Sequence, residues 1–304
     1  MIVDFFYIFV HIKRTYLSIL FMKRTIKLFA VVALLASFTA CDKNDDLTES
    51  EPRLVKLSSF EYDSYYPEGH AEHTVYTLTY GENDKLATID MERYSFSYDE
   101  ENEIYTSESE LDRKIVTTFT WKEGLTVDFV RTDVAFNGDK QYDQGTRNGS
   151  YTFDEKGKAL TCNYKWDRYT YKYTFGYEGN YLVNANCDGF KSSYTWEKED
   201  LITLTDEYQT TNFTYSNDAN PIIIGANPLF MSFLQNEGDD FSMGLLGRHP
   251  AHLPIKALYS SAWDDETYER NYEYKKDGQG RLVEIKMTVP DYGEGAYLTY
   301  KLNY

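Results

Sequence analysis

Residues 168–177, RYTYKYTFGY, place an aromatic ring at every second position. Side chains alternate between the two faces of a β-strand, so the five rings share one face and the basic and hydroxyl residues share the other. One face is therefore predicted to be buried and the other to face water. Glu178, Gly179 and Asn180 follow directly, and these are residues that tight hairpin turns favour.

The same phrase recurs along the chain as two ring-bearing or apolar residues flanking one residue, then a polar turn, then a small apolar strand start. It is plainest at Tyr151 and Phe153 before Leu160, and at Tyr272 and Tyr274 before Leu282. Looser copies begin at Leu78, Phe96, Phe119, Tyr173 and Tyr194. The copies are spaced by roughly 20 residues, the length of two strands and their connections. The spacing predicts a meander of antiparallel hairpins.

The predicted fold is all-β, a single antiparallel hairpin meander that forms a curved or closed barrel-like sheet. We expect about 14 to 18 strands with Tyr and Phe inside, because closure removes exposed strand edges. A two-sheet sandwich is the alternative. A membrane-spanning barrel is a further one, since Leu298, Tyr300, Leu302 and Tyr304 form a C-terminal apolar stripe of the kind seen in such barrels. Against it, the aromatic faces are rich in Tyr and poor in the aliphatic residues that lipid favours.

The hairpin rhythm stops between residues 221 and 257. Asn227 and Pro228 have the features of a helix cap and first helical position, and Leu229, Phe230, Phe233 and Leu234 follow at helical spacing. This predicts a short helical insertion near residues 226–246. We expect it to cover one end of the sheet or to form the rim of a ligand site.

The N-terminal region has the features of an export signal. Met22, Lys23, Arg24 and Lys27 precede a short apolar segment that ends in small residues and Cys41. Residues 22–40 resemble a bacterial lipoprotein signal peptide, which implies cleavage before Cys41 and a diacylglycerol anchor on its sulfur. Residues 1–21 do not fit this pattern, and we interpret them as a mis-assigned upstream start.

The predicted mature chain begins with an acidic tether, residues 41–52, followed by a single β domain, residues 53–304. The tether resembles the acidic tag that sends some lipoproteins of Gram-negative anaerobes to the cell surface. That resemblance implies a lipid-anchored outer-membrane protein that faces the cell exterior. Attachment facing the periplasm is the alternative.

Composition limits the partners. The formal net charge is -18, from 49 acidic and 31 basic residues. Such a surface repels phosphate backbones, so no nucleic acid is expected as a partner. The expected partners are the membrane, through the lipid on Cys41, and a glycan or surface protein.

Candidate ligand-binding residues are Trp166, near a predicted turn, and Trp263, beside two aspartates, because indole rings can stack on sugars. Packing at the end of the sheet is the alternative role for both. Trp121 and Trp196 occupy the core position of the repeated phrase. Neither a catalytic constellation nor a cofactor motif is recognised in the sequence.

The histidine and cysteine patterns give weak signals. His70 with His73, and His249 with His252, share a spacing that can hold a metal, but no recognised zinc signature surrounds them, so we expect polar loops and no metal. Cys162 is predicted to face Tyr173 and Cys187 to face Lys172 on the opposite side of the sheet. The two are therefore expected to remain thiols.

The hairpin phrase is similar to the YD-type repeats of large secreted bacterial proteins, in Tyr98-Asp99, in residues 153–158 and in residues 280–282. The order of signal, acidic tether, aromatic hairpins, helical interruption and closing hairpin resembles a family of uncharacterised lipoproteins described as a domain of unknown function with a porin-like fold. The resemblance implies a barrel-like sheet and no known activity. We therefore expect a binding or scaffold module, with a structural envelope lipoprotein as the alternative and a glycan-active enzyme as a weaker one.

Overall fold

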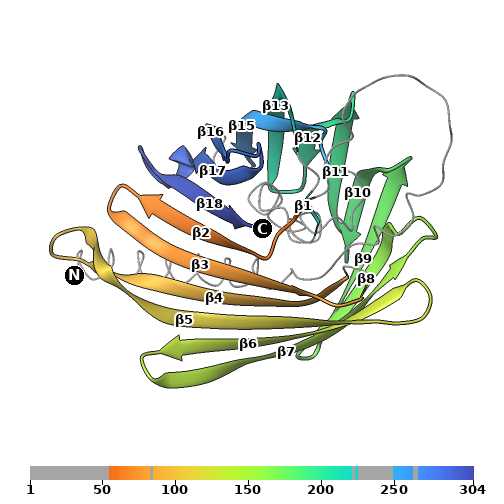
Figure 1. The fold of residues 1–304 in the computed structure, drawn as a ribbon, viewed down its shortest axis with the longest axis horizontal. Helices are drawn as coiled ribbons and strands as arrows, with labels where there is room; N and C mark the ends of the chain where they lie inside the picture. Colours follow the sequence, from red (N-terminus) through yellow and green to blue (C-terminus); the bar gives the residue numbers. More distant parts are fainter. Residues whose placement is uncertain (1–54, 83–84, 221–222, 225–248, 263–265) are drawn as a thin grey trace, which may run out of the picture.

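The chain folds into a closed β-barrel. The computed structural model describes residues 55–304 except 83–84, 221–222, 225–248 and 263–265 (Figure 1). Sixteen strands pair antiparallel with their neighbours in chain order, and β18 pairs with β2 to close the ring. This confirms the predicted all-β meander and its closure into a barrel. The sandwich alternative is wrong.

The strands differ in length around the ring. The long strands β4 to β7 form one wall, and the shorter strands β10 to β17 lie opposite (Figure 1). The elements are β1 (Val55–Lys56), β2 (Ser59–Tyr66), β3 (Gly69–Tyr80), β4 (Leu86–Asp99), β5 (Ile104–Trp121), β6 (Thr126–Asn137), β7 (Lys140–Phe153), β8 (Ala159–Trp166), β9 (Tyr169–Glu178), β10 (Tyr181–Cys187), β11 (Phe190–Glu197), β12 (Asp200–Thr205), β13 (Gln209–Ala219), β14 (Ile223–Ile224), β15 (His252–Ser261), β16 (Thr267–Lys276), β17 (Leu282–Thr288), the 3-10 helix η2 (Pro290–Tyr292) and β18 (Tyr297–Asn303).

The period-two pattern separates the inside of the barrel from the outside. In β9, Tyr173 and Phe175 are buried, whereas Lys172 and Thr174 are exposed. The C-terminal stripe obeys the same rule, because Leu298, Tyr300 and Leu302 are all buried. The stripe therefore faces the interior and does not supply the lipid-facing surface that the membrane-spanning alternative needs. Inner positions can be crowded enough to require glycine, since a Cβ at Gly149 would lie 2.3 Å from the Phe129 ring.

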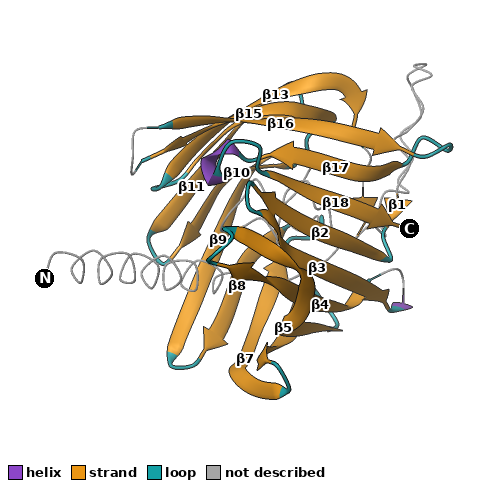
Figure 2. Cartoon of the chain, turned by 90° about the vertical axis from the view of Figure 1, so that its left-hand side faces the viewer, coloured by secondary structure: helices purple, strands orange, loops and turns teal. Residues whose placement is uncertain are grey.

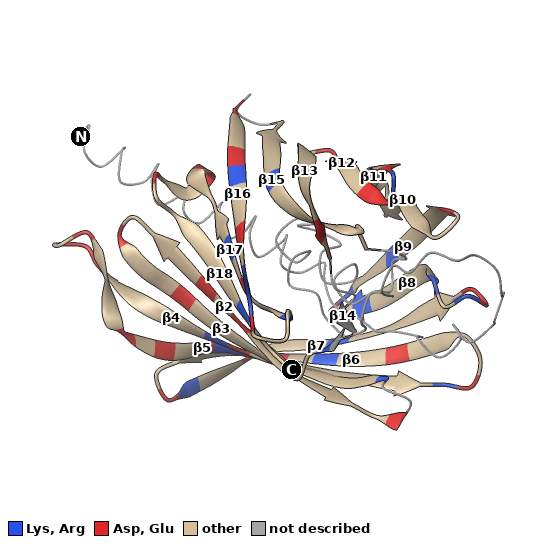
Figure 3. Cartoon of the chain, turned by 45° about the horizontal axis from the view of Figure 1, so that its top comes forward, with Lys and Arg blue, Asp and Glu red and all other residues tan. Residues whose placement is uncertain are grey.

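Ion pairs join neighbouring strands on the outer wall, and Figure 3 shows acidic and basic residues spread along the strands. Lys114 on β5 contacts Glu92 of β4 at 2.6 Å, Lys256 contacts Glu269 at 2.6 Å, and Lys275 contacts Glu284 at 2.6 Å. A charge on the lipid face of a membrane barrel costs about 2–4 kcal/mol at mid-depth. The described outer wall is therefore suited to water. Among the described residues, no helix is both long and apolar enough to span a membrane.

One end of the barrel carries a repeated hydrogen bond. Each hairpin begins near a small apolar residue, and a Tyr or Trp near its last position donates to the backbone carbonyl of that residue. Seven of the eight hairpins have this bond, which we call the leucine rim: Tyr80 to Leu57, Trp121 to Leu86, Tyr177 to Ala159, Trp196 to Leu182, Tyr215 to Leu201, Tyr274 to Pro254 and Tyr304 to Leu282. The rim includes the end of the chain, which lies at the right in Figure 2.

The leucine rim explains the repeated sequence phrase. A buried strand end leaves polar backbone atoms that need partners, and Tyr and Trp combine a large apolar body with one donor. The β6–β7 hairpin lacks such a donor because Phe153 ends it, and there the backbone N–H of Phe153 donates to the Leu125 carbonyl at 2.8 Å. In the neighbouring phrase the buried strand start is Ala159, and the predicted Leu160 is exposed.

Basic side chains cover several rim rings. Lys56 lies 4.1 Å from the centre of the Tyr80 ring, and Lys158 lies 5.0 Å from that of Tyr177. Each of these lysines directly precedes the residue whose carbonyl receives the rim bond. A cation over an aromatic face is attracted by the ring quadrupole. The phrase therefore encodes both the donor and the cation that covers it.

Two short strands lie apart from the ring. β1 pairs with β14 in parallel, Val55 opposite Ile223, and both lie within the ring of strands in the views of Figures 1 and 3. The predicted helical insertion near residues 226–246 falls wholly within 225–248, outside the described residues. The same holds for the predicted signal peptide, tether and lipid attachment at Cys41.

Candidate functional site

Four arginines lie on four neighbouring strands of the inner wall, in two directly opposed pairs. Arg93 of β4 is directly opposite Arg113 of β5, and Arg131 of β6 is directly opposite Arg147 of β7. Each occupies an inward position that apolar residues hold elsewhere on its strand; Arg131, for example, continues the alternation of Val127 and Phe129. Like charges directly opposite each other destabilise a sheet. This arrangement therefore needs compensating groups.

Two aspartates compensate part of this charge. Arg93 donates through Nε and Nη2 to the two oxygens of Asp112, at 2.9 and 2.8 Å. Arg113 holds Asp133 in the same forked manner at 2.9 and 2.6 Å, and Arg147 lies 3.8 Å from Asp133. Together with Arg131 they form a group of six residues that we call the arginine cluster: Arg93, Asp112, Arg113, Arg131, Asp133 and Arg147. Forked pairs of this kind fix geometry as well as charge.

A β-bulge places Asp112. The register of β4 with β5 shifts after Arg93, so that Tyr94 is opposite Leu111 and Asp112 has no opposite residue. An extra residue in one strand redirects its neighbours, and here the Asp112 carboxylate meets both Arg93 and the Ser95 hydroxyl, which donates at 2.7 Å. Bulges of this kind cannot be read from a hairpin pattern.

Exposure changes across the arginine cluster. The side chains of Arg93 and Asp112 are 30% and 28% exposed, whereas those of Arg147 and Asp133 are 4% and 2% exposed. Burial raises the pKa of Asp133, but the hydrogen bonds from Arg113 and the charges of three arginines outweigh it and leave the pKa below its usual value. Burial lowers the pKa of Arg147. The cluster therefore has a buried base and an accessible upper part.

Glu72 of β3 adds a carboxyl group of different character. Burial raises the pKa of Glu72, although Arg93, Arg113 and the hydroxyl of Thr74 partly oppose the shift. The Thr74 hydroxyl donates to Glu72 at 2.8 Å. Glu72 therefore differs from Asp133, whose pKa is lowered by its arginine partners.

Trp166 lies beside the arginine cluster. It is the last residue of β8 and is directly opposite Arg147, whose guanidinium carbon is 4.6 Å from the centre of the indole ring. The structure thus places this predicted candidate on the inner wall at the end of a strand. Trp263, the other candidate, lies outside the described residues. Trp121 and Trp196 belong to the leucine rim.

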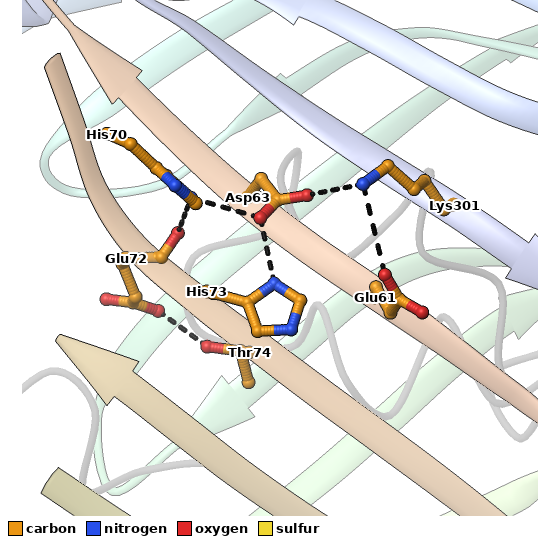
Figure 4. Close-up of polar contacts among 7 residues, drawn as sticks. All are labelled: Glu61, Asp63, His70, Glu72, His73, Thr74 and Lys301. Carbon is orange, nitrogen blue, oxygen red and sulfur yellow. Dashed lines mark hydrogen bonds and ion pairs between the residues drawn. The ribbon is translucent and has the colours of Figure 1, made fainter. Parts of the chain in front are cut away.

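The predicted loop at His70 and His73 is wrong, because both residues lie in β3 and converge on Asp63 of β2 (Figure 4). His73 Nδ1 lies 2.8 Å and His70 Nε2 3.0 Å from the same Asp63 oxygen, and Lys301 lies 3.2 Å from the other. His70 Nε2 is also 3.0 Å from the Glu72 carbonyl, so it must carry a proton.

Asp63 explains why this group exists. It points to the outer face, yet its side chain is only 4% exposed because the two imidazoles and Lys301 cover it. Burial raises the pKa of Asp63, but hydrogen bonds from His73 and Lys301 hold it below its usual value. The spacing of the histidines therefore serves to cover a carboxylate.

In the second histidine pair, His252 lies in β15, so the loop predicted there is also wrong at this residue. His252 of β15 donates from its backbone and bonds through Nδ1 to Asp200 of β12, at 3.0 and 2.8 Å. This contact joins two strands that flank β13. Within the described part of the chain, no three His, Cys, Asp or Glu side chains form a metal-binding group. Asp239, Asp240, Asp264 and Asp265 lie outside it.

The cysteines are both buried thiols. Cys162 is opposite Tyr173 as predicted, but Cys187 is opposite Tyr173 as well, on its other side. A register shift between Leu182 and Asn184 moves Cys187 by one residue, so the prediction that it faces outward opposite Lys172 is wrong. The two sulfurs remain two strands apart, which places the side chains beyond the reach of a disulfide.

Comparisons with known proteins bear on the fold. No known family matches the chain, and neither does any curated protein sequence. The chain is similar to a porin-like protein from Bacteroides uniformis, with 16% identity over 81% of this chain and 97% of that one, at a TM-score of 0.56. A porin-like protein from Bacteroides vulgatus matches at 14% identity over 82% and 98%, with a TM-score of 0.37.

A third solved structure is a β-barrel-like protein of a domain of unknown function from Brucella abortus, with 12% identity over 82% of this chain and 97% of that one, and a TM-score of 0.32. The likeness to the Bacteroides uniformis protein supports the predicted porin-like barrel. At this identity it concerns the fold alone, so the lipoprotein and repeat resemblances stay predictions.

Proposed function

We propose that this chain is a lipid-anchored envelope protein whose barrel binds a glycan on its inner wall beside Trp166. The carrying observation is the pairing of Trp166 with Arg147 at a strand end, next to the accessible Arg93 and Asp112. Indole rings stack on sugars, and a few placed polar groups beside an apolar surface are typical of ligand sites. The charged outer wall leaves the barrel free to work in water.

Titration of the purified protein against a panel of glycans tests this proposal. Trp166→Ala should reduce affinity for any ligand found by about tenfold or more, because a stacked ring is lost. Phe190→Ala is the matched control, an exposed aromatic residue at the start of β11 that lies away from Arg147. The proposal fails if no glycan binds, which favours a structural envelope protein, or if both variants behave alike.

Incubating the glycan ligand with the protein and analysing the products tests the expectation that the chain is not an enzyme. An unchanged ligand would agree with a binding module. Release of shorter saccharides would contradict it, and would direct attention to Glu72 and Asp133, whose environments shift their pKa values in opposite directions.

Lipid anchoring is supported by the signal-like segment that ends at Cys41. Cys41→Ser should leave an unprocessed or soluble chain, because the apolar anchor is missing. Detergent-phase partitioning checks this, and equal partitioning of variant and wild type would contradict it.

Surface display rests on the acidic residues after Cys41. Replacing Asp45 and Asp46 with Ala should keep the lipid but reduce the fraction that protease removes from whole cells. Wild-type protein that resists such treatment would place the barrel on the periplasmic side.

A further inference from the structure

The inner wall carries positive charge inside an acidic protein. The whole chain has a formal net charge of -18, yet the described part of this wall brings four guanidinium groups together with three carboxyl groups, those of Glu72, Asp112 and Asp133. The surplus of cations is local and opposite in sign to the molecule as a whole. Walls of low dielectric strengthen the field of such a group and attract ions of opposite charge.

The accessible part of the cluster is suited to contact a ligand. Arg93 and Asp112 are the most exposed members, whereas Asp133 is held in the buried base by Arg113. Arg93 forms a forked pair with the Asp112 carboxylate through Nε and Nη2, so a planar anion of a ligand would compete with Asp112 for this guanidinium. The buried arginines contribute their charge without needing to touch the ligand.

The distance between Arg93 and Trp166 suits a ligand made of several sugars. Arg93 lies on β4 and Trp166 on β8, four strands apart along the same wall. Neighbouring strands are about 4.8 Å apart, so this is roughly 19 Å across the strands, and the register adds an offset of four residues, since Arg113 is opposite Ala135 and not Arg131. A ligand that uses both ends is an oligosaccharide.

We infer that the glycan ligand is acidic, an oligosaccharide whose carboxylate or sulfate groups contact Arg93 beside the arginine cluster while a sugar ring stacks on Trp166. The inference rests on the proposed function and adds the chemical class of the ligand. Asp112 then acts as the internal competitor for Arg93. Its removal should favour the ligand and not harm binding.

Three matched polymers test the inference on the full-length protein: dextran, carboxymethyl-dextran and dextran sulfate. We expect each acidic polymer to bind at least tenfold more tightly than dextran, and binding to weaken with salt. The two acidic polymers also separate carboxylate from sulfate as the preferred group. Equal affinity for neutral dextran would overturn the inference and leave the proposed function standing.

Two variants with opposite charge changes give the decisive comparison. R93Q should reduce the affinity for the acidic polymers about tenfold, and D112N should keep or raise it. The controls K275Q and E284Q make the same charge changes in an ion pair on the outer wall. The inference is overturned if R93Q and K275Q weaken binding equally, if D112N weakens it, or if none of the polymers binds. In the last case, binding of a neutral glycan from the panel would still support the proposed function.

Discussion

At the leucine rim, the barrel buries neutral polar groups that pair a side-chain donor with a backbone carbonyl, whereas the arginine cluster buries full charges. The rim repeats in seven of the eight hairpins, and in two of them Trp takes the place of Tyr as the donor. The cluster occurs once in the described barrel, on the long strands β4 to β7. The comparison shows that one repeat unit can supply a structural element everywhere and a specialised surface at one place.

The largest effect should come from breaking the arginine cluster on one side only. Arg113→Met leaves the buried Asp133 without its forked partner, and we expect a loss of about 3–5 kcal/mol in the free energy of unfolding. Urea denaturation measures it. The double variant Arg113→Met with Asp133→Leu should recover part of the loss, because the unpaired carboxylate is gone, although Arg131 and Arg147 stay buried without the Asp133 charge.

Lys275→Met, in an exposed ion pair, is the control and should change stability by no more than about 0.5 kcal/mol. If the single and double variants at Arg113 were equally destabilised, the charge argument for this cluster would be wrong.

The second-largest loss of stability should come from a change in the aromatic interior. Tyr173→Ala creates a cavity between Cys162 and Cys187, and we expect about 3 kcal/mol of destabilisation. Lys172→Ala, the outward neighbour, should cost no more than about 0.5 kcal/mol. Comparable effects at both positions would mean that the aromatic face does not form the core.

A single rim bond should have a smaller effect. Tyr215→Phe removes the hydroxyl that donates to Leu201 and should cost about 1 kcal/mol, because the ring stays in place. Tyr169→Phe, on an exposed tyrosine, is the control with an expected change near zero. If the effect at Tyr215 were no larger than that of the control, the rim residues would stabilise the barrel by hydrophobic packing alone and not through their hydrogen bonds.

The smallest expected effect is a difference in pH dependence between the arginine cluster and the leucine rim. The pKa of Asp133 is below its usual value, so its contribution is present at neutral pH and is lost in acid as pH falls through that lowered pKa. Burial raises the pKa of Tyr304 to about 12, so its contribution is complete below about pH 10 and is lost as pH rises toward 12.

Denaturation midpoints measured across both ranges check this difference. The double variant at Arg113 and Asp133 should flatten only the acid limb, and Tyr304→Phe only the alkaline limb. A variant that altered both limbs equally would show that the two regions unfold through the same titrating groups.

Period-two patterns and turn residues were enough to predict the barrel. The turns at Asp167-Arg168 and Gly179-Asn180 are formed as expected, and Cys162 has the partner that this register requires. Prediction failed where one extra residue entered a strand: the bulge near Val183 reversed the expected side of Cys187, and the bulge at Asp112 placed a carboxylate that no repeat indicated. Whether a strand takes up an extra residue depends on how its side chains pack against those of neighbouring strands, and the hairpin pattern does not show this.

The sequence made Trp166 a candidate ligand-binding residue because of its type and its place near a turn. It did not indicate the arginine cluster. One signal was available. Arg131 and Arg147 fall on the same alternation as Phe129 and Tyr151, so a charged residue occupies an inward position in two successive strands. Charges on the buried side of a strand are uncommon and need partners. Which partners they find depends on a register that the hairpin pattern leaves open.

Each rim hydrogen bond joins the first and last residues of one hairpin and involves no other hairpin. The unit, which runs from 15 residues between Leu182 and Trp196 to 36 residues between Leu86 and Trp121, is therefore self-contained, and its ends lie next to each other at the same edge. Tandem duplication or loss of a whole unit would leave every remaining bond intact and change only the circumference. The architecture is thus one in which a gene can lengthen or shorten the ring by copying a single segment, while a surface such as the arginine cluster diverges within a few copies.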